Sequence, residues 1–270
     1  MTTIPRRRPL VNLAAFAAVT AVAAIMVVVA LFVIWTGRAS LPAPPLLGDP
    51  PVLAGRQLYG PCAGGFYARR GDEIVLTSSA HCASEGTTAY APDGRTVRGV
   101  FGEKAVIEPC EHAATHTCRP SDMDLLVVAP DQIPWGRLNV VDLGHGGART
   151  IPEGTRPLAC GDIAVGDKVE INGREIFRSG TVAEIGPYLH DPAQDRDYFP
   201  CIVAARDIRA SSGDSGGAVL VRGVPAGVTS RSFNGPLGFT PLAEGLAALG
   251  LELCTTPDCG LTPPAPTLVP

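Results

Sequence analysis

A glycine-rich turn that holds one serine stands directly before an apolar run, in the segment Ser211-Ser212-Gly213-Asp214-Ser215-Gly216-Gly217-Ala218-Val219. A serine hydroxyl is a weak nucleophile. It attacks an acyl carbon only with a base within hydrogen-bond reach and with donors for the oxygen that becomes negative. Glycine lets the backbone turn tightly and lets a substrate approach the main-chain N–H groups. The segment therefore indicates a turn built around Ser215 as a candidate nucleophile.

A candidate base lies upstream, where the apolar run 74–76 leads into Leu76-Thr77-Ser78-Ser79-Ala80-His81-Cys82. Together with Gly213–Gly217, this segment resembles the chymotrypsin/trypsin-like serine protease family, in which the nucleophile turn reads Gly-Asp-Ser-Gly-Gly and the base follows Thr-Ala-Ala-His-Cys. The nearby Cys62-Ala63-Gly64-Gly65 is similar to a Cys-Gly-Gly segment of that family. The resemblance covers about residues 52–253. It implies an all-β fold of two antiparallel six-stranded Greek-key barrels with a short C-terminal helix.

The resemblance implies a Ser-His-Asp triad, with Ser215 as nucleophile and His81 as base, and an oxyanion hole formed by the N–H groups of Gly213 and Ser215. Two aspartates compete for the third place in Asp122-Met123-Asp124-Leu125-Leu126-Val127-Val128. The family pattern is Asp, apolar, small, apolar, apolar. Starting at Asp122 would bury the charge of Asp124, which is costly without a partner. We therefore favour Asp124, with Asp122 as the alternative.

The resemblance also assigns substrate-binding residues: Arg209 and Ala210 at the base of the specificity pocket, Gly238 lining it, and Ser230, Arg231 and Ser232 as the strand edge that pairs with the substrate backbone. A positive pocket base would repel Lys and Arg side chains and attract Glu or Asp. If Arg209 turns away instead, a small pocket for modest apolar side chains remains. Both preferences are expected ahead of a basic one.

The chain of 270 residues is 46% hydrophobic and contains 31 glycines, 26 prolines and 8 cysteines, with a formal net charge of −4. Its short apolar runs favour many short strands over long helices. The runs predicted as strands are 74–76, 96–101, 105–107, 124–128, 168–171, 179–185, 198–204, 218–221 and 226–230, and residues 242–251 have helical spacing. No basic patch suggests nucleic-acid binding.

An even number of cysteines is compatible with four disulfides. The resemblance implies Cys62–Cys82, and proximity or position favours Cys110–Cys118, Cys160–Cys201 and Cys254–Cys259. A zinc site of Cys110, Cys118, His112 and His116 is the alternative for the second pair.

The N-terminal region predicts a membrane anchor. No charged residue lies between Val11 and Thr36, and Arg6, Arg7 and Arg8 precede that stretch. It is long enough to cross a bilayer, and the arginines favour a cytoplasmic N-terminus with the rest of the chain outside. A cleaved signal peptide, which would give a secreted protein, is the alternative.

The expected organisation is a cytoplasmic tail (1–10), an anchor (11–36), a proline-rich linker (37–51), a protease domain (52–253) and a proline-rich tail (254–270). Within the domain we expect one barrel over about 52–130, a second over about 150–241, and the helix over about 242–251. We expect a monomer that needs no cofactor or metal.

The most favoured function is a serine endopeptidase that cuts proteins or peptides through an acyl-enzyme. A catalytically weak or inactive binding module on the same fold is the alternative. Esterases and acyltransferases more often use a Gly-x-Ser-x-Gly elbow with the order Ser, Asp, His, which this chain lacks. Family zymogens free an N-terminus that pairs with the aspartate before the serine. Val52-Leu53-Ala54-Gly55 resembles that terminus only superficially, so Asp214 needs a partner that the sequence does not identify.

Overall fold

The structure is a computed structural model that describes residues 51–59, 62–144, 147–173, 176–190, 196–232 and 236–264. The expected tail 1–10 and anchor 11–36 lie outside the described residues, as do the linker before Pro51 and the end of the chain after residue 264. Within the described ranges, no helix is long and apolar enough to cross a membrane.

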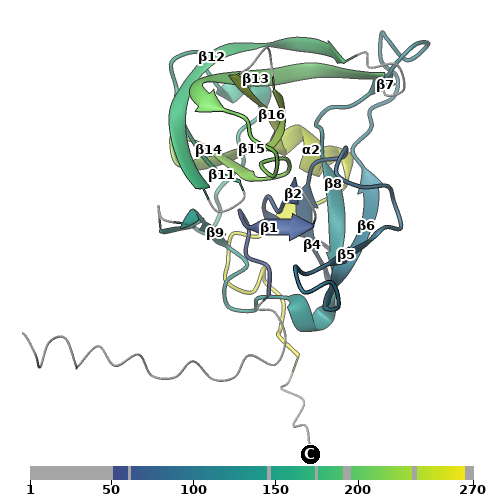
Figure 1. Cartoon of the computed structure of the whole chain (residues 1–270), viewed down its shortest axis with the longest axis vertical. Coiled ribbons are helices and arrows are strands. Elements are labelled where there is room, and N and C mark those ends of the chain that lie inside the picture. Colours follow the sequence, from purple (N-terminus) through teal and green to yellow (C-terminus); the bar gives the residue numbers. More distant parts are fainter. Residues whose placement is uncertain are drawn as a thin grey trace, which may run out of the picture. The chain divides into compact units, whose positions relative to one another are not determined.

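Two sheets dominate the described part of the chain, and their strands are antiparallel apart from one short addition (Figure 1). The first is six-stranded, in the order β17 (Glu252–Leu253), β3 (Tyr67–Arg70), β4 (Glu73–Ser78), β8 (Asp124–Val128), β6 (Val97–Lys104) and β5 (Thr88–Tyr90). The second is seven-stranded, in the order β12 (Ile176–His190), β11 (Lys168–Gly173), β14 (Ala218–Val221), β15 (Val224–Ser232), β16 (Pro236–Pro241), β13 (Asp197–Arg209) and β7 (Thr117–Cys118). Because β12 also pairs with β13, six strands of the second sheet close into a barrel.

Smaller elements complete the described part. β1 (Gln57–Tyr59) pairs with β2 (Cys62–Ala63), and β9 (Val140–Asp142) pairs with β10 (Ala148–Thr150). Two 3-10 turns are η1 (Pro130–Gln132) and η3 (Cys160–Asp162), and α2 spans Leu242–Ala248.

Each sheet encloses its own apolar core. Phe66, Leu76, Phe101 and Leu126 lie in the first core, and Val169, Val182, Val203 and Phe239 lie in the second. After the last strand of the second barrel, α2 buries Leu242 and Leu246 in the first core, and β17 then adds to β3. The C-terminal segment therefore leaves the second sheet and packs against the first.

The predicted strands are present except one. Residues 105–107 form no strand, although Ala105 N–H donates to the Met123 carbonyl at 2.8 Å and Ile107 N–H donates to the Cys118 carbonyl at 2.9 Å. These two bonds go to different segments, so no continuous ladder forms. The helix is shorter than its pattern suggests: it ends at Ala248, and Gly250 follows with φ +62°.

All eight cysteines lie in the described residues, and they form the four pairs expected from the sequence: Cys62–Cys82, Cys110–Cys118, Cys160–Cys201 and Cys254–Cys259. The zinc alternative thereby loses its thiolate ligands, because Cys110 and Cys118 are bonded to each other.

Candidate active site

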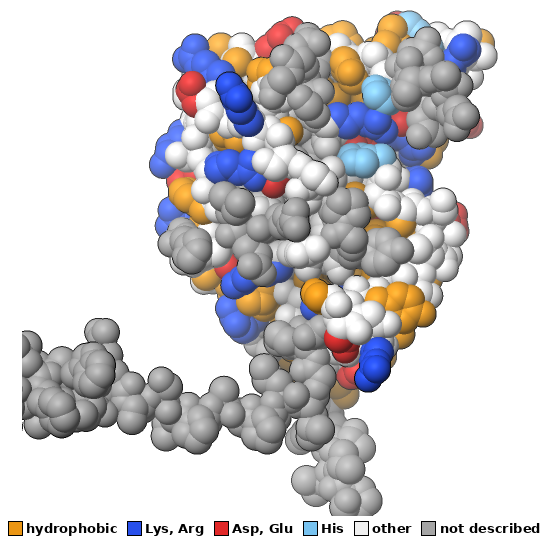
Figure 2. Space-filling view, viewed as in Figure 1, with side chains coloured by type: hydrophobic (Ala, Val, Ile, Leu, Met, Phe, Trp, Pro, Cys, Tyr) orange, Lys and Arg blue, Asp and Glu red, His pale blue; other side chains and the backbone are white. Residues whose placement is uncertain are grey.

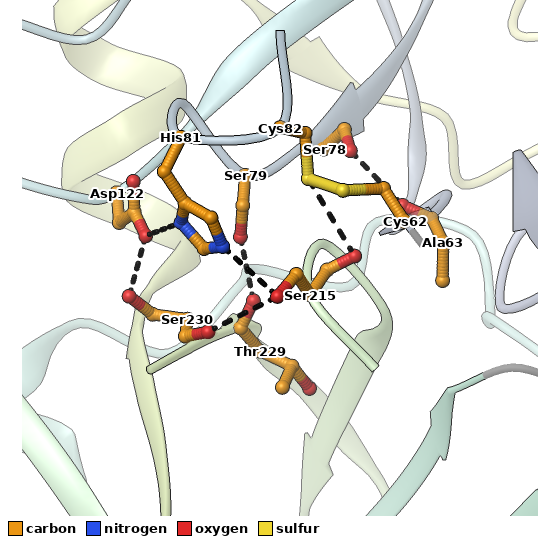
Figure 3. Close-up of a disulfide and its surroundings, with 10 residues drawn as sticks. All are labelled: Cys62, Ala63, Ser78, Ser79, His81, Cys82, Asp122, Ser215, Thr229 and Ser230. Atoms are coloured by element: carbon orange, nitrogen blue, oxygen red, sulfur yellow. Dashed lines mark hydrogen bonds and ion pairs between the residues drawn. A yellow bond between two sulfur atoms is a disulfide. The ribbon is translucent and has the colours of Figure 1, made fainter. Parts of the chain in front are cut away.

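His81 lies between an aspartate and a serine, just after the end of β4 (Figure 3). Its Nδ1 is 2.7 Å from Asp122 Oδ2, and its Nε2 is 2.9 Å from Ser215 Oγ. Ser215 follows the turn that leads into β14 of the second barrel, whereas His81 and Asp122 belong to the first. The structure thus brings together a serine, a histidine and an aspartate that are distant in the sequence.

The aspartate that contacts His81 is Asp122, the alternative from the sequence, and not Asp124, which the sequence pattern favoured. Asp124 begins β8, where it is opposite Ser78 on one side and Lys104 on the other. Its side chain is fully buried, and neither carboxyl oxygen has a hydrogen-bond partner among the described residues. The cost of burying Asp124 is therefore real. It is reduced by protonation, because burial and then the charge of Asp122 raise the pKa of Asp124 well above its ordinary value.

Asp122 has the contacts that hold a carboxylate in its charged form. Burial raises its pKa, but the hydrogen bond and charge of His81, and then the hydrogen bond from Ser230, outweigh that effect and lower the pKa of Asp122 to about 2. Ser230 Oγ donates to Asp122 Oδ2 at 2.5 Å, and Asp122 N–H donates to Thr240 Oγ1 at 3.0 Å. Asp122 is thus an anion held against the imidazole.

Two N–H groups of the turn around Ser215 have no acceptor among the described residues. Gly213 has φ +104°, a conformation that favours glycine, and neither Gly213 N–H nor Ser215 N–H has an acceptor within the described part of the chain. The turn is held on the other side, where Ala63 N–H donates to the Ser215 carbonyl at 2.7 Å and Gly216 N–H donates to the Thr229 carbonyl at 2.7 Å. Two N–H groups beside a fixed nucleophile can stabilise an oxyanion.

Comparison with known proteins identifies this architecture. No protein-family model and no curated protein sequence matches the chain. Solved structures do match. One is described as a glutamic acid specific serine protease that uses a histidine triad in substrate binding (TM-score 0.57, 23% identity, covering 75% of this chain and 100% of that one). Another is Thermobifida fusca protease A (TM-score 0.56, 24% identity, covering 75% and 97%). A third is the Cellulomonas bogoriensis chymotrypsin (TM-score 0.55, 20% identity, covering 76% and 99%). The chain has the chymotrypsin-like serine protease fold. The expected all-β fold class is confirmed.

The buried Asp214 directly precedes Ser215, and its ion-pair partner is Arg178 of β12. The Arg178 guanidinium forms an ion pair with Asp214 Oδ1, and Ser211 N–H donates to Asp214 Oδ2 at 2.7 Å. The Asp214 side chain is 2% exposed. Arg178 therefore supplies the positive charge that the sequence left unassigned. Val52 is held elsewhere, because Tyr67 Oη donates to its carbonyl.

Replacing Arg178 by alanine should leave the Asp214 carboxylate buried without its ion-pair partner. Breaking such a pair typically costs about 3–5 kcal/mol, and the disturbed turn should lower kcat/KM by roughly 10²-fold. Urea unfolding and peptide hydrolysis measure the two effects. Arg206→Ala, which removes an exposed arginine of β13, is the matched control and should change stability by less than about 0.5 kcal/mol. Equal stability of the two variants would contradict the structural role of Arg178.

A pocket of about 370 Å³ opens beside Ser215. It is lined by His81, His190, Ala210, Ser211, Ser212, Asp214, Ser215, Thr229, Ser230 and Arg231. Figure 2 shows histidine side chains next to Lys or Arg side chains on one face of the molecule. Ala210, Ser230 and Arg231 were expected here. His190 was not, because it stands at the far end of β12, where no local motif marks it.

Arg209 does not line this pocket, contrary to the sequence-based assignment. Its side chain is exposed and lines a neighbouring pocket of about 590 Å³ with Arg206, Asp207, Ile208, Ala210 and Pro236. Pairing of Arg209 with Pro236 at the end of β13 fixes this placement. Gly238 is buried in β16 opposite Ala204 and lines neither pocket, and Ser232 ends β15 opposite Leu237.

The buried carboxyl of Asp124 predicts a pH effect on stability. A raised pKa in the folded state contributes stability that is present below the ordinary value of 3.8 and is lost as the pH rises towards the folded pKa. In that window the loss is about 1.4 kcal/mol per pH unit. Asp124→Asn cannot ionise, so its stability relative to the wild type should grow as the pH rises from 4 to 7. Thermal unfolding across this range measures the difference. A constant difference would show that Asp124 does not titrate abnormally.

Proposed function

We propose that this chain is a serine endopeptidase that cuts peptide bonds through an acyl-enzyme. The observation that carries the proposal is the continuous hydrogen-bond chain from Asp122 through His81 to Ser215. A nucleophile, a base that contacts it and a group that orients the base are the parts that acyl transfer needs. Binding alone would not require Asp122, His81 and Ser215 to be hydrogen-bonded in series, so this arrangement favours the enzyme over an inactive binding module.

Ser215 Oγ attacks the carbonyl carbon of the scissile bond, and His81 Nε2 takes the hydroxyl proton. Asp122 accepts the Nδ1–H hydrogen bond, which fixes the tautomer and stabilises the imidazolium. The N–H groups of Gly213 and Ser215 hold the oxyanion. His81 then gives the proton to the leaving amine as the C–N bond breaks. A water molecule, deprotonated by His81, releases the acyl group and restores Ser215.

The substrate is proposed to bind as an added strand along β15. β14 pairs with β15 only from Val224 to Val228, so residues 230–232 carry no partner on that side among the described residues. The Ser230 carbonyl is 3.4 Å from Ser215 Oγ, which places this edge beside the nucleophile. Proteins or peptides in extended conformation are therefore the proposed substrates.

We also propose that the enzyme works outside the cytoplasm, as a monomer anchored by residues 11–36. The support is the uncharged N-terminal stretch behind three arginines, together with four disulfides, which persist in oxidising compartments. Secretion after cleavage of that stretch is the alternative. Protease accessibility of intact cells, followed by the mass of the mature protein, separates the two.

A fluorophosphonate probe tests the proposed chemistry on the purified full-length protein. The probe phosphonylates an activated serine, with fluoride as the leaving group, and tryptic mapping should place the label on Ser215. Ser211 and Ser212 lie in the same pocket and serve as internal controls, because neither contacts His81. Labelling spread over these serines, or no labelling of the folded protein, would contradict the proposal.

A further inference from the structure

Arg231 lines the Ser215 pocket, and the carboxylates around it in the described part of the chain compensate its positive charge only partly. A guanidinium only donates hydrogen bonds. Among the described residues, the Arg231 guanidinium contacts His190 Nε2 and Asp197 Oδ2. The oxygen of Asp197 is 3.7 Å away, longer than a charge-assisted hydrogen bond. The Arg231 side chain is 20% exposed, and its Nε is buried without a hydrogen-bond partner in the described part of the chain.

The carboxylate of Asp197 is already committed to another arginine. Arg119 Nε donates to Asp197 Oδ1 at 2.7 Å, so Arg119 and Arg231 share one anion. Asp214 lines the pocket, and its charge is balanced by Arg178. Among the described residues, the charge of Arg231 in this pocket is therefore only partly compensated.

His190 fixes the direction of that charge without adding to it. The guanidinium has no acceptor atom, so His190 Nε2 must be the acceptor and the imidazole is neutral in this contact. A neutral ring on β12 thus holds the Arg231 side chain of β15 in place. Holding the guanidinium in advance lowers the entropic cost of binding an anion.

The register of the added strand says which substrate residue meets Arg231. Ser230 Oγ points to Asp122, and successive side chains of a strand point to opposite faces, so Arg231 projects from the other face of β15. The Ser230 carbonyl lies beside Ser215 Oγ, which sets the residue before the scissile bond opposite Ser230. In an antiparallel pair, moving one residue forward on β15 corresponds to moving one residue back on the substrate. The second residue before the scissile bond is then opposite Arg231, with its side chain on the same face.

We propose that Arg231, held by His190, selects an acidic side chain at the second residue before the scissile bond. The inference rests on the proposed endopeptidase function and adds a specificity determinant to it. A glutamate there replaces water around the guanidinium and forms a charge-assisted hydrogen bond. A lysine there meets a like charge.

Matched peptides test the proposal with the full-length protein in detergent. A peptide library first selects the preferred residue before the scissile bond. Quenched fluorescent peptides are then made that differ only at the second residue, as Glu, Gln or Lys. We expect kcat/KM to be about tenfold higher for Glu than for Gln, and lower again for Lys. The Glu-to-Gln ratio should shrink in 1 M salt, because screening weakens a partly exposed ion pair.

Variants test whether Arg231 causes the preference for glutamate at the second residue. Arg231→Gln should bring the Glu-to-Gln ratio to about 1, whereas Arg231→Lys should keep part of it, since the charge remains. Arg206→Gln removes an arginine from the neighbouring pocket and should leave the ratio unchanged. If Arg231→Gln does not fold, the wild-type ratio, its salt dependence and the Arg231→Lys ratio still decide.

Equal cleavage of the Glu and Gln peptides by the wild type would overturn this inference and leave the endopeptidase proposal standing. The same holds if the preference survives in folded Arg231→Gln, or if it falls on the first residue instead of the second. Absence of both cleavage and fluorophosphonate labelling would overturn the proposed function and this inference together.

Discussion

Alanine in place of Ser215 is expected to lower kcat/KM by up to about 10⁶-fold, the scale of nucleophile removal in another serine protease. The substitution removes the oxygen that attacks the carbonyl carbon and carries the acyl group, so the acyl-enzyme cannot form. Stability should change little, because the polar contacts of Ser215 Oγ among the described residues are limited to His81 Nε2 at 2.9 Å and the Ser230 carbonyl at 3.4 Å. Hydrolysis of the best library peptide and thermal unfolding measure the two quantities.

The residual rate of Ser215→Ala is informative as well. The N–H groups of Gly213 and Ser215 remain in place, so hydrolysis above the uncatalysed rate should persist at a low level. Ser212→Ala provides a comparison in the same turn. Wild-type hydrolysis by the Ser215→Ala protein would show that another group is the nucleophile, and a large loss of stability would show that the turn had collapsed.

Asparagine at position 122 should lower kcat/KM on the order of 10⁴-fold. An amide donates through its nitrogen, so it can hold the imidazole in the wrong tautomer, and it carries no charge to stabilise the imidazolium. Asp122 also contributes stability above its ordinary pKa of 3.8 that is lost as the pH falls towards about 2, because its folded pKa is depressed. Steady-state kinetics at neutral pH measures the catalytic effect.

Asp124→Asn is the matched control for this prediction. Both aspartates are buried, and they are two residues apart in the chain, but only Asp122 contacts His81. We expect the Asp124 variant to keep kcat/KM within a few-fold of the wild type and to be the more stable protein at neutral pH. If Asp124→Asn loses activity and Asp122→Asn does not, the placement of the carboxylate seen here does not operate in the enzyme.

The two aspartates show where sequence reasoning reached its limit. Short contiguous motifs place His81 and Ser215 in particular turns, and the structure brings their side chains into contact. Asp122 and Asp124 stand in the same short stretch before the apolar residues of one strand. Choosing Asp122 for the triad meant burying Asp124, and the cost of burying a charge therefore favoured Asp124. A buried aspartate can remain protonated, however, and a neutral carboxyl group avoids most of the free-energy cost of burying a charge.

The other omissions have a topological cause. Arg178 and His190 both belong to β12, a strand that reaches the active site only because its hairpin with β13 closes the second barrel. Neither residue stands in a motif, and their partners Asp214 and Arg231 are 36 and 41 positions away in the chain. Arg209 shows the reverse error, since its sequence position near the nucleophile suggested a pocket base, whereas strand pairing takes its side chain to the neighbouring pocket.

The ion pair between Arg178 and Asp214 has a consequence for how such an enzyme could be controlled. The charge that pairs with Asp214 comes from within the same barrel, so under the proposed function the turn around Ser215 needs no newly cut N-terminus to order it. Severing the chain ahead of the folded domain would then change where the protease acts without changing how fast it acts. Regulation would have to operate on synthesis, on inhibitors or on access to substrate, and shedding from a membrane would spread an activity that was already present.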